Sequence, residues 1–234
     1  MSAQASSTLV VLLSGRKGVG KDTAADLLVR HHGFMKVAFA DALRLMALDV
    51  VRTFMGYEHA SMSWFTHRGA KEVPMWDINE YQLANPQWAD DPDTRIPVVH
   101  PSRRTPRQVM QVLGTDIVRR HVGANVWVDA TIQRIQKAQA ASAATRVVIS
   151  DCRFPIEHAR VRDAFPDARV IVLRLEGEHA RAPRNNTGRH EHVSETAMDG
   201  YESFYAVVHN DKRKGPETLL LQLEQVMGLS GSST

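Results

Sequence analysis

Cysteine is nearly absent from this sequence of 234 residues, and its scarcity limits what the chain can be. The single cysteine, Cys152, excludes an internal disulfide and fits a reducing compartment such as the cytoplasm. Because no second spaced pair of ligands accompanies the His-Glu-His run at 190–192, a structural zinc site is not expected there. The sequence therefore predicts a cytoplasmic protein that folds without disulfides or structural zinc.

Long apolar runs are missing as well. No stretch approaches the roughly 20 apolar residues that a helix needs to cross a bilayer. Residues 1–15 lack the basic start and the apolar length of a signal peptide. The sequence has no internal repeat and is 43% hydrophobic, so we expect one large domain, 1–234, with a full core. Its net charge of +3 suits anionic partners such as nucleotides, without indicating nucleic acid.

Strand-like and helix-like segments alternate along the chain. Apolar runs typical of buried parallel strands occur at 8–13, 35–40, 145–151, 168–175 and 204–211. Segments with helical periodicity or helix-capping signals lie at 21–32, 41–56, 105–122, 124–141, 155–165 and 215–228. This alternation predicts an α/β fold with a parallel sheet flanked by helices.

Two stretches interrupt the alternation. Residues 57–103 hold five prolines and three of the four tryptophans without a clear period, so we expect an irregular insertion, functional because of its length. Residues 176–194 are polar and basic. We expect them to form a lid that closes over a bound nucleotide and excludes water. The alternative is a solvated basic loop.

A glycine-rich loop follows the first expected strand. Gly15, Gly20 and Lys21 have the spacing of a phosphate-binding loop, and the loop lies between a buried strand and a helix, as that motif requires. Its backbone N–H groups and the helix N-terminus are predicted to hold ATP phosphates, with Lys21 reaching the β- and γ-phosphates. The expected ATP-binding residues of the loop are Gly15, Lys17, Gly18, Gly20, Lys21, Asp22 and Thr23.

Asp22 stands where an ordinary Walker loop has a serine or threonine that binds Mg²⁺. A carboxylate can bind Mg²⁺ directly or through water, orient the acceptor hydroxyl, or cap the helix. Thr23 offers a hydroxyl one residue later, for the cap or the metal. These alternatives stay open, and we keep Lys21 and Asp22 as catalytic candidates.

Six motifs in chain order resemble the phage deoxynucleoside monophosphate kinases, a family of P-loop nucleotide kinases. They are GRKGVGKDT at 15–23, FADALR at 39–44, RQVMQVLGTDIVRRHVGANVWVD at 107–129, VVISDCRFPIEHARV at 147–161, HVSE at 192–195 and VVHND at 207–211. The resemblance implies transfer of the γ-phosphoryl group of ATP, with Mg²⁺, to a deoxynucleoside monophosphate in the cytoplasm, of a host cell if the protein is phage-encoded. Only the insertion 57–103 lacks clear counterparts in the family, and we expect it to form an acceptor-side lobe. A homodimer is plausible for the family and stays open.

Residues in the matching helix are candidates for binding the acceptor. Arg107 and Gln111 match the family motif and share one helix face with Arg104. We interpret Arg107 as a phosphate contact, since a guanidinium binds phosphate with two hydrogen bonds, and Gln111 as a contact to base or sugar. The alternative is a solvated polar face. The other acceptor candidates are Arg44, Asp116, Trp127, Arg153 and Glu195, of which Trp127 also fits a place in the core.

Further candidates follow the later strands. Asp151 ends the strand at 145–151, where a carboxylate can hold Mg²⁺ through water or accept the hydrogen bond of the attacking group. Arg153 is a catalytic candidate that would clamp the acceptor phosphate, unless it only pairs with Asp151. Asp41 is a weaker metal candidate. The resemblance places Asn210 against the adenine of ATP. The basic candidates in and beside the lid are Arg174, Arg181, Arg184 and Arg189, and which of them reaches the γ-phosphate stays open.

Two other functions remain as alternatives. In the first, the same loop serves a kinase that phosphorylates a hydroxymethylated pyrimidine in DNA, because the basic and aromatic residues of 57–104 leave room for a strand. Steep salt dependence of DNA binding would identify it. In the second, the chain is a nucleotide-dependent DNA-binding module without kinase activity. No helix-turn-helix or single-strand-binding signature in the sequence supports it.

Overall fold

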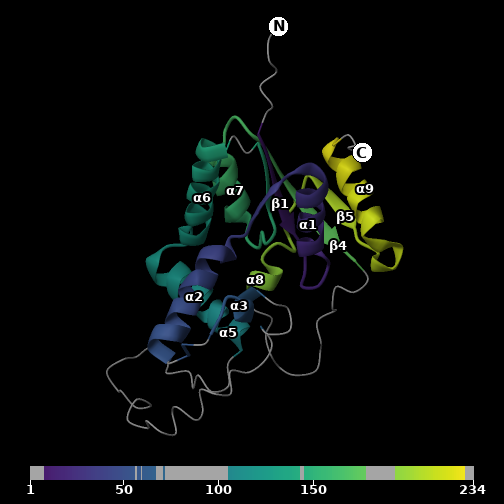
Figure 1. The fold of residues 1–234 in the computed structure, drawn as a ribbon. Helices are drawn as coiled ribbons and strands as arrows, with labels where there is room; N and C mark the ends of the chain where they lie inside the picture. Colours follow the sequence, from purple (N-terminus) through teal and green to yellow (C-terminus); the bar gives the residue numbers. More distant parts are fainter. Residues whose placement is uncertain are drawn as a thin grey trace. The chain divides into compact units, whose positions relative to one another are not determined.

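The computed structural model describes residues 8–55, 57–58, 60–66, 71, 105–142, 145–177 and 193–229. The chain divides into two compact units (Figure 1). Unit 1 comprises Met1–Phe39 and Val128–Thr234, and unit 2 is Ala40–Trp127. No described helix is both long enough and apolar enough to cross a membrane.

Unit 1 is built on a five-stranded sheet in the order β2-β3-β1-β4-β5, with every neighbouring pair parallel. The apolar run of β1 is buried along its whole length, as a strand covered on both faces must be. The sheet confirms the α/β fold expected from the sequence. The two outermost strands, β2 and β5, are shorter than predicted. The strands are β1 (Leu9–Ser14), β2 (Met35–Val37), β3 (Arg146–Ile149), β4 (Arg169–Glu176) and β5 (Ala206–His209).

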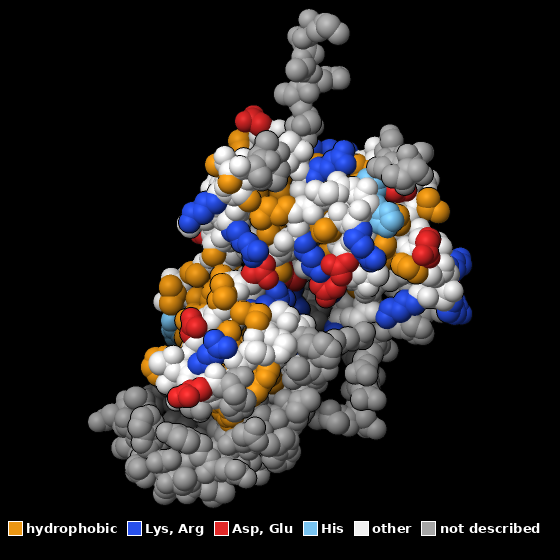
Figure 2. All heavy atoms as spheres, viewed as in Figure 1, with side chains coloured by type: hydrophobic (Ala, Val, Ile, Leu, Met, Phe, Trp, Pro, Cys, Tyr) orange, Lys and Arg blue, Asp and Glu red, His pale blue; other side chains and the backbone are white. Residues whose placement is uncertain are grey.

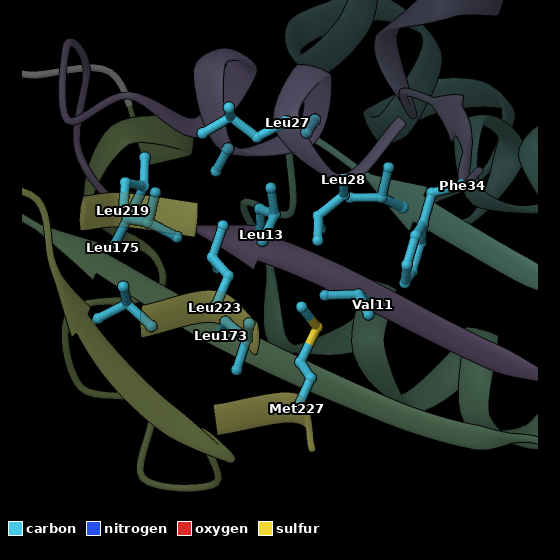
Figure 3. Packing of buried hydrophobic residues seen from close by; sticks show 14 of the residues in the cluster. Val11, Leu13, Leu27, Leu28, Phe34, Leu173, Leu175, Leu219, Leu223 and Met227 are labelled. Atoms are coloured by element: carbon cyan, nitrogen blue, oxygen red, sulfur yellow. The ribbon is translucent and has the colours of Figure 1, made fainter. Parts of the chain in front are cut away.

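Helices cover both faces of this sheet. On one face, Val11 and Leu13 of β1 pack against α1 (Lys21–His32) and α9 (Gly215–Met227), as Figure 3 shows. On the other face, Val10 and Leu12 pack with residues of α6 (Val126–Ser142) and α7 (Pro155–Ala164). Because the side chains of β1 alternate between two clusters, the central strand is held in position from both faces. The same packing holds the start of the loop that follows β1.

A buried histidine lies on α7. His158 is 8% exposed, and its Nδ1 lies 2.6 Å from the hydroxyl of Tyr201. Its Nε2 has no hydrogen-bond partner within the described part of the chain. Burial lowers the pKa of His158 below its ordinary value, and the nearby charge of Arg162 lowers it further. Both effects favour the neutral imidazole over the charged one.

Unit 2 is helical and has its own core. It contains α2 (Ala40–Met55), α3 (Ser63–Thr66), α5 (Pro106–Gln111) and the π-helix η4 (Val112–Val122). Tyr57, Ala60 and Phe65 are buried against α2. Within 57–103, Ser63–Thr66 form a helix where irregular structure was expected. The prediction missed it because four residues are too few to show a helical period in the sequence. The later part of 57–103, apart from Lys71, lies outside the described residues.

The helix predicted at 105–122 changes its winding partway along. Thr105 caps it: the Thr105 hydroxyl accepts from the Gln108 N–H at 3.3 Å, and the Gln108 side chain accepts from the Thr105 N–H at 2.9 Å. From Val112 the helix is π-wound. Gly114 lies so close to α2 that a Cβ there would stand 2.5 Å from the Leu43 side chain. The change of winding is not visible in the sequence.

Candidate functional site

The glycine-rich loop has a backbone that only glycine adopts easily. Gly15, Gly18 and Gly20 have φ angles of 135°, 89° and 99°. Space is equally tight, because a Cβ on Gly15 would lie 2.3 Å from the Leu175 carbonyl oxygen and one on Gly20 would lie 2.4 Å from Nδ2 of Asn210. The loop is therefore packed directly against the end of β4 and the residue that follows β5. Gly15 and Gly20 are therefore required both by their φ angles and by close packing, and Gly18 by its φ angle.

The loop ends at the start of α1. Gly20 is the N-cap and supplies no side-chain cap bond, so Asp22 and Thr23 lie inside the first turn rather than at the cap. Both residues are exposed, and the Asp22 carboxylate lies 3.5 Å from the Lys36 ammonium. Lys21 turns back over the loop, where its ammonium donates to the carbonyls of Gly15 and Arg16, the second at 3.0 Å. The helix N-terminus and the Lys21 charge thus belong to one loop, an arrangement suited to an anion.

Asp151 lies beside this loop at the carboxyl edge of the sheet. The parallel register of β1 and β3 pairs Leu12 with Ile149, so the residues that follow each strand run next to each other. The Cys152 N–H still donates to the Leu13 carbonyl, at 3.1 Å. Asp151 is 9% exposed, and its Oδ1 accepts from the Phe39 N–H at 2.7 Å. The carboxylate is thus held in place by backbone, beside the start of the loop.

A buried glutamate that the sequence analysis did not select holds the turn containing Arg153. Glu157 is 1% exposed, and its Oε2 accepts from the backbone N–H groups of Arg153, at 2.6 Å, and of Phe154, at 3.0 Å. Because Phe154 at the start of α7 has no polar side chain, only the glutamate half of a capping box is formed. The signal was present in the sequence, since Pro155 and Glu157 stand where a first turn favours them.

A cavity of about 490 Å³ lies between the loop and the carboxyl ends of β4 and β5. This volume is within the usual range of small-molecule sites. The buried amide of Asn210 donates to the Val19 carbonyl at 2.8 Å, and the Asn210 N–H donates to the Glu176 carbonyl at 2.7 Å. Asn210 therefore joins the loop to both strands and lines the cavity. The lining residues are Arg16, Val19, Arg174, Leu175, Glu176, Gly177, His209, Asn210 and Asp211.

Two arginines of this cavity share one carboxylate. Asp199 Oδ1 accepts from Arg174 at 2.9 Å, and Oδ2 accepts from Arg16 at 2.5 Å. Burial raises the pKa of Asp199, but the hydrogen bonds from Arg174 and Arg16 outweigh burial and hold the pKa below its ordinary value. Charged side chains of both signs lie close together on the face shown in Figure 2. Arg174 lies in β4, as the strand expected at 168–175 predicts, and β4 continues to Glu176.

The acceptor candidates divide between the two units. Arg44 lies on α2, where it donates to Asp41 at 2.6 Å, and Arg107 and Gln111 lie on α5. The exposed Asp116 lies on η4. These residues belong to unit 2, whereas Arg153, Asp151 and the loop belong to unit 1.

Trp127 is buried at the end of unit 2. Its side chain is 6% exposed, and its indole N–H donates to the Gly114 carbonyl at 3.0 Å. These contacts are those of a core residue. Stacking of Trp127 on a base stays a prediction.

Several candidates fall outside the described residues. They are Arg104, Arg181, Arg184 and Arg189, the His-Glu-His run at 190–192, and most of the lid segment 176–194. The side chain of Glu195 is also not described. Their roles stay predictions. Among the residues that are described, no cluster of three or more His, Cys, Asp or Glu side chains forms a ready metal site. A metal here would need ligands from the bound nucleotide as well.

Comparison with known proteins gives one informative match. The family model described as "Deoxynucleotide monophosphate kinase" matches residues 96–214, about half of the chain. The curated proteins give no match. Among solved structures, an unliganded sugar kinase from Janibacter sp. HTCC2649 is similar at 13% identity and a TM-score of 0.41, over 95% of this chain and 96% of that chain. A likeness at that level carries no argument about function.

Proposed function

The chain belongs to the deoxynucleotide monophosphate kinase family, and on this premise we propose how its two units divide the reaction. Family membership supports phosphorylation of deoxynucleoside monophosphates, which yields the diphosphates. In our proposal unit 1 binds ATP and unit 2 binds the acceptor nucleotide. The distribution of candidates supports this division: the phosphate loop and its cavity lie in unit 1, whereas Arg44, Arg107 and Gln111 lie in unit 2.

The donor side follows from the loop. Backbone N–H groups of the glycine-rich turn and the first turn of α1 bind the ATP phosphates, and Lys21 moves from the loop carbonyls to the β- and γ-phosphates. The adenine enters the cavity beside the loop, where Val19 and Leu175 offer apolar surface and Asn210 offers a polar edge. This placement supports the sequence-based assignment of Asn210 to the base.

Residues that fit Mg²⁺ stand at both sides of the loop. Asp22 and Thr23 lie exposed in the first turn of α1, and Asp151 ends the neighbouring strand. Mg²⁺ in kinases is held by one or two carboxylates together with water and substrate phosphates, so this donor set suits it. When bound, the ion would cancel part of the negative charge that the transferred group carries.

The acceptor side follows from the family motif on α5. Arg107 binds the acceptor phosphate, and Gln111 contacts the base or sugar from one helical turn further along. We keep Arg153, whose backbone N–H donates to Glu157, as a candidate contact to the acceptor phosphate. Arg44 is a second candidate for that phosphate. The lone thiol Cys152 is consistent with action in the reducing cytoplasm.

The observation that carries the proposal is the loop itself: three left-handed glycines and Lys21 between a buried strand and a helix, in a chain of this family. The test is a phosphoryl-transfer assay with Mg²⁺ and ATP. Each deoxynucleoside monophosphate, modified pyrimidines included, is compared with single-stranded and duplex DNA. Lys21→Ala is the inactive variant, and Lys212→Ala, an exposed lysine of η5 (Lys212–Lys214), is its matched control.

The expected result is diphosphate product from free monophosphates, lost in Lys21→Ala and kept in Lys212→Ala. Label that enters DNA alone would replace the free nucleotide by a DNA acceptor. ATP binding without any phosphorylated product would overturn the kinase assignment. A further pair of variants tests the division between the units: Arg107→Ala should raise KM for the monophosphate and Gly20→Ala should raise KM for ATP.

A further inference from the structure

The carboxylate of Asp199 joins two arginines of the cavity, and neither the family motifs nor the reaction accounts for it. We propose that Asp199 is a positioning residue for the donor nucleotide: anchored by Arg174, it holds the Arg16 guanidinium where Arg16 binds an ATP phosphate. The proposal rests on the assignment of this cavity to ATP. It gives Arg16 a role that its place in the glycine loop alone does not predict.

Arg174 is the fixed end of the arrangement. Its Nε donates to Glu176 at 3.3 Å, its Nη1 to the Met198 carbonyl at 3.1 Å, and its Nη2 to Asp199 at 2.9 Å. The guanidinium lies 5.5 Å from the centre of the Phe204 ring, and the side chain is 14% exposed. A planar group held along three edges and one face has little freedom to move. Arg174 therefore fixes Asp199 rather than being fixed by it.

Arg16 is the more exposed end of the arrangement. It follows Gly15 in the loop, and its side chain, 30% exposed, reaches Asp199 Oδ2 through Nη2 at 2.5 Å. The Arg16 carbonyl accepts from the Lys21 ammonium, so Arg16 contacts Lys21 through its backbone and Asp199 through its side chain. Asp199 provides a counter-charge for Arg16 from a segment 183 residues away.

Binding energy explains why such an arrangement favours ATP. A long arginine side chain that becomes immobilised only when the ligand arrives weakens binding, because its conformational freedom is lost at that step. In this proposal Asp199 holds Arg16 before the nucleotide binds, and the Arg16 side chain, which lines the cavity and is 30% exposed, stays accessible to a phosphate. Isolated exposed ion pairs contribute little to stability. The effect of Asp199 should therefore appear in ATP binding more than in folding.

The experiment measures dissociation constants by calorimetry for ATP and adenosine with the full chain. The variants are Asp199→Asn, Arg16→Gln and the double variant. Asp163→Asn, an exposed aspartate of α7 that also lies near an arginine, at 3.8 Å, is the matched control. Asp199→Asn should weaken ATP about 5- to 10-fold and adenosine less than twofold. Arg16→Gln should do the same, and the double variant should be no weaker than Arg16→Gln alone.

Three results would overturn the inference. The first is unchanged ATP affinity in Asp199→Asn, and the second is an equal loss for ATP and adenosine, which would indicate structural damage. The third is tighter ATP binding, which would make Asp199 a competitor of the nucleotide for Arg16. Wild-type protein that binds no ATP would refute the donor assignment and this inference together, whereas normal ATP binding with an unaffected Asp199→Asn would refute the inference alone.

Discussion

Removing the Glu157 side chain tests how a buried carboxylate supports both stability and the site. In Glu157→Ala the backbone N–H groups of Arg153 and Phe154 lose the acceptor that lies 2.6 and 3.0 Å away. Each unsatisfied donor costs roughly 1–3 kcal/mol, and both residues are only half-buried, so water can compensate in part. We expect the free energy of unfolding to fall by about 2–4 kcal/mol. For a chain of this size that corresponds to a Tm lower by roughly 5–12 °C.

The same variant should impair catalysis, because the turn that carries Arg153 loses its anchor. Urea unfolding gives the stability, and steady-state kinetics at a temperature well below Tm give KM and kcat. Glu157→Gln keeps an acceptor oxygen and loses only the charge, so it should cost about half as much. Glu202→Ala, at an exposed glutamate, is the control and should leave Tm within about 1 °C. Equal Tm values for Glu157→Ala and Glu202→Ala would refute the reasoning.

Three further predictions concern single residues. In Gly20→Ala a residue at a φ of +99° would carry a Cβ 2.4 Å from Asn210, so the free energy of unfolding should fall by about 1–3 kcal/mol from backbone strain alone and ATP affinity should fall more than tenfold. Gly33→Ala is the control, because at a φ of +65° its Cβ meets open space, and it should leave ATP affinity unchanged. Because burial lowers the pKa of His158, the folded state resists protonation of this side chain. The free energy of unfolding should therefore be highest above pH 6.5 and should decrease as the pH falls from 6.5 toward the lowered pKa. His158→Gln should flatten this dependence, as measured by Tm against pH. Trp127→Phe removes a buried hydrogen bond and should lower the free energy of unfolding by roughly 1–2 kcal/mol. The KM for the monophosphate should stay within twofold of the wild-type value. A raised KM at unchanged stability would instead indicate that Trp127 contacts the base.

The sheet was predictable because each strand shows its apolar pattern within a few consecutive residues. Continuous apolar runs such as those of β1 and β3 can be buried only between two layers, and their alternation with helices left one kind of fold. The loop was predictable for the same reason, since its glycines and Lys21 are close together in sequence. The short edge strands were less predictable, because how far a strand pairs depends on its single neighbour.

What the sequence did not predict depends on distant residues. Asp199 forms ion pairs with Arg16 and Arg174, which are 183 and 25 residues away in the sequence. No local sequence pattern predicts either ion pair. Arg174 was expected inside the strand 168–175, and its pairing with Ser14 of β1 confirms this, but nothing in that strand predicts its contact with Asp199. The π-winding of η4 escaped prediction because its apolar positions also fit an α-helix.

The burial of Cys152 gives the chain a built-in probe. The thiol is 2% exposed and follows Asp151 at the edge of the candidate site. As the only cysteine of the sequence, it can react with a thiol reagent only while this edge opens, so the labelling rate of unmodified protein reports the free energy of that opening. A nucleotide that binds only the closed form would slow the reaction in proportion to its occupancy. Ligand screening and local stability can thus be read from one native sulfur atom, without introducing a label by mutation.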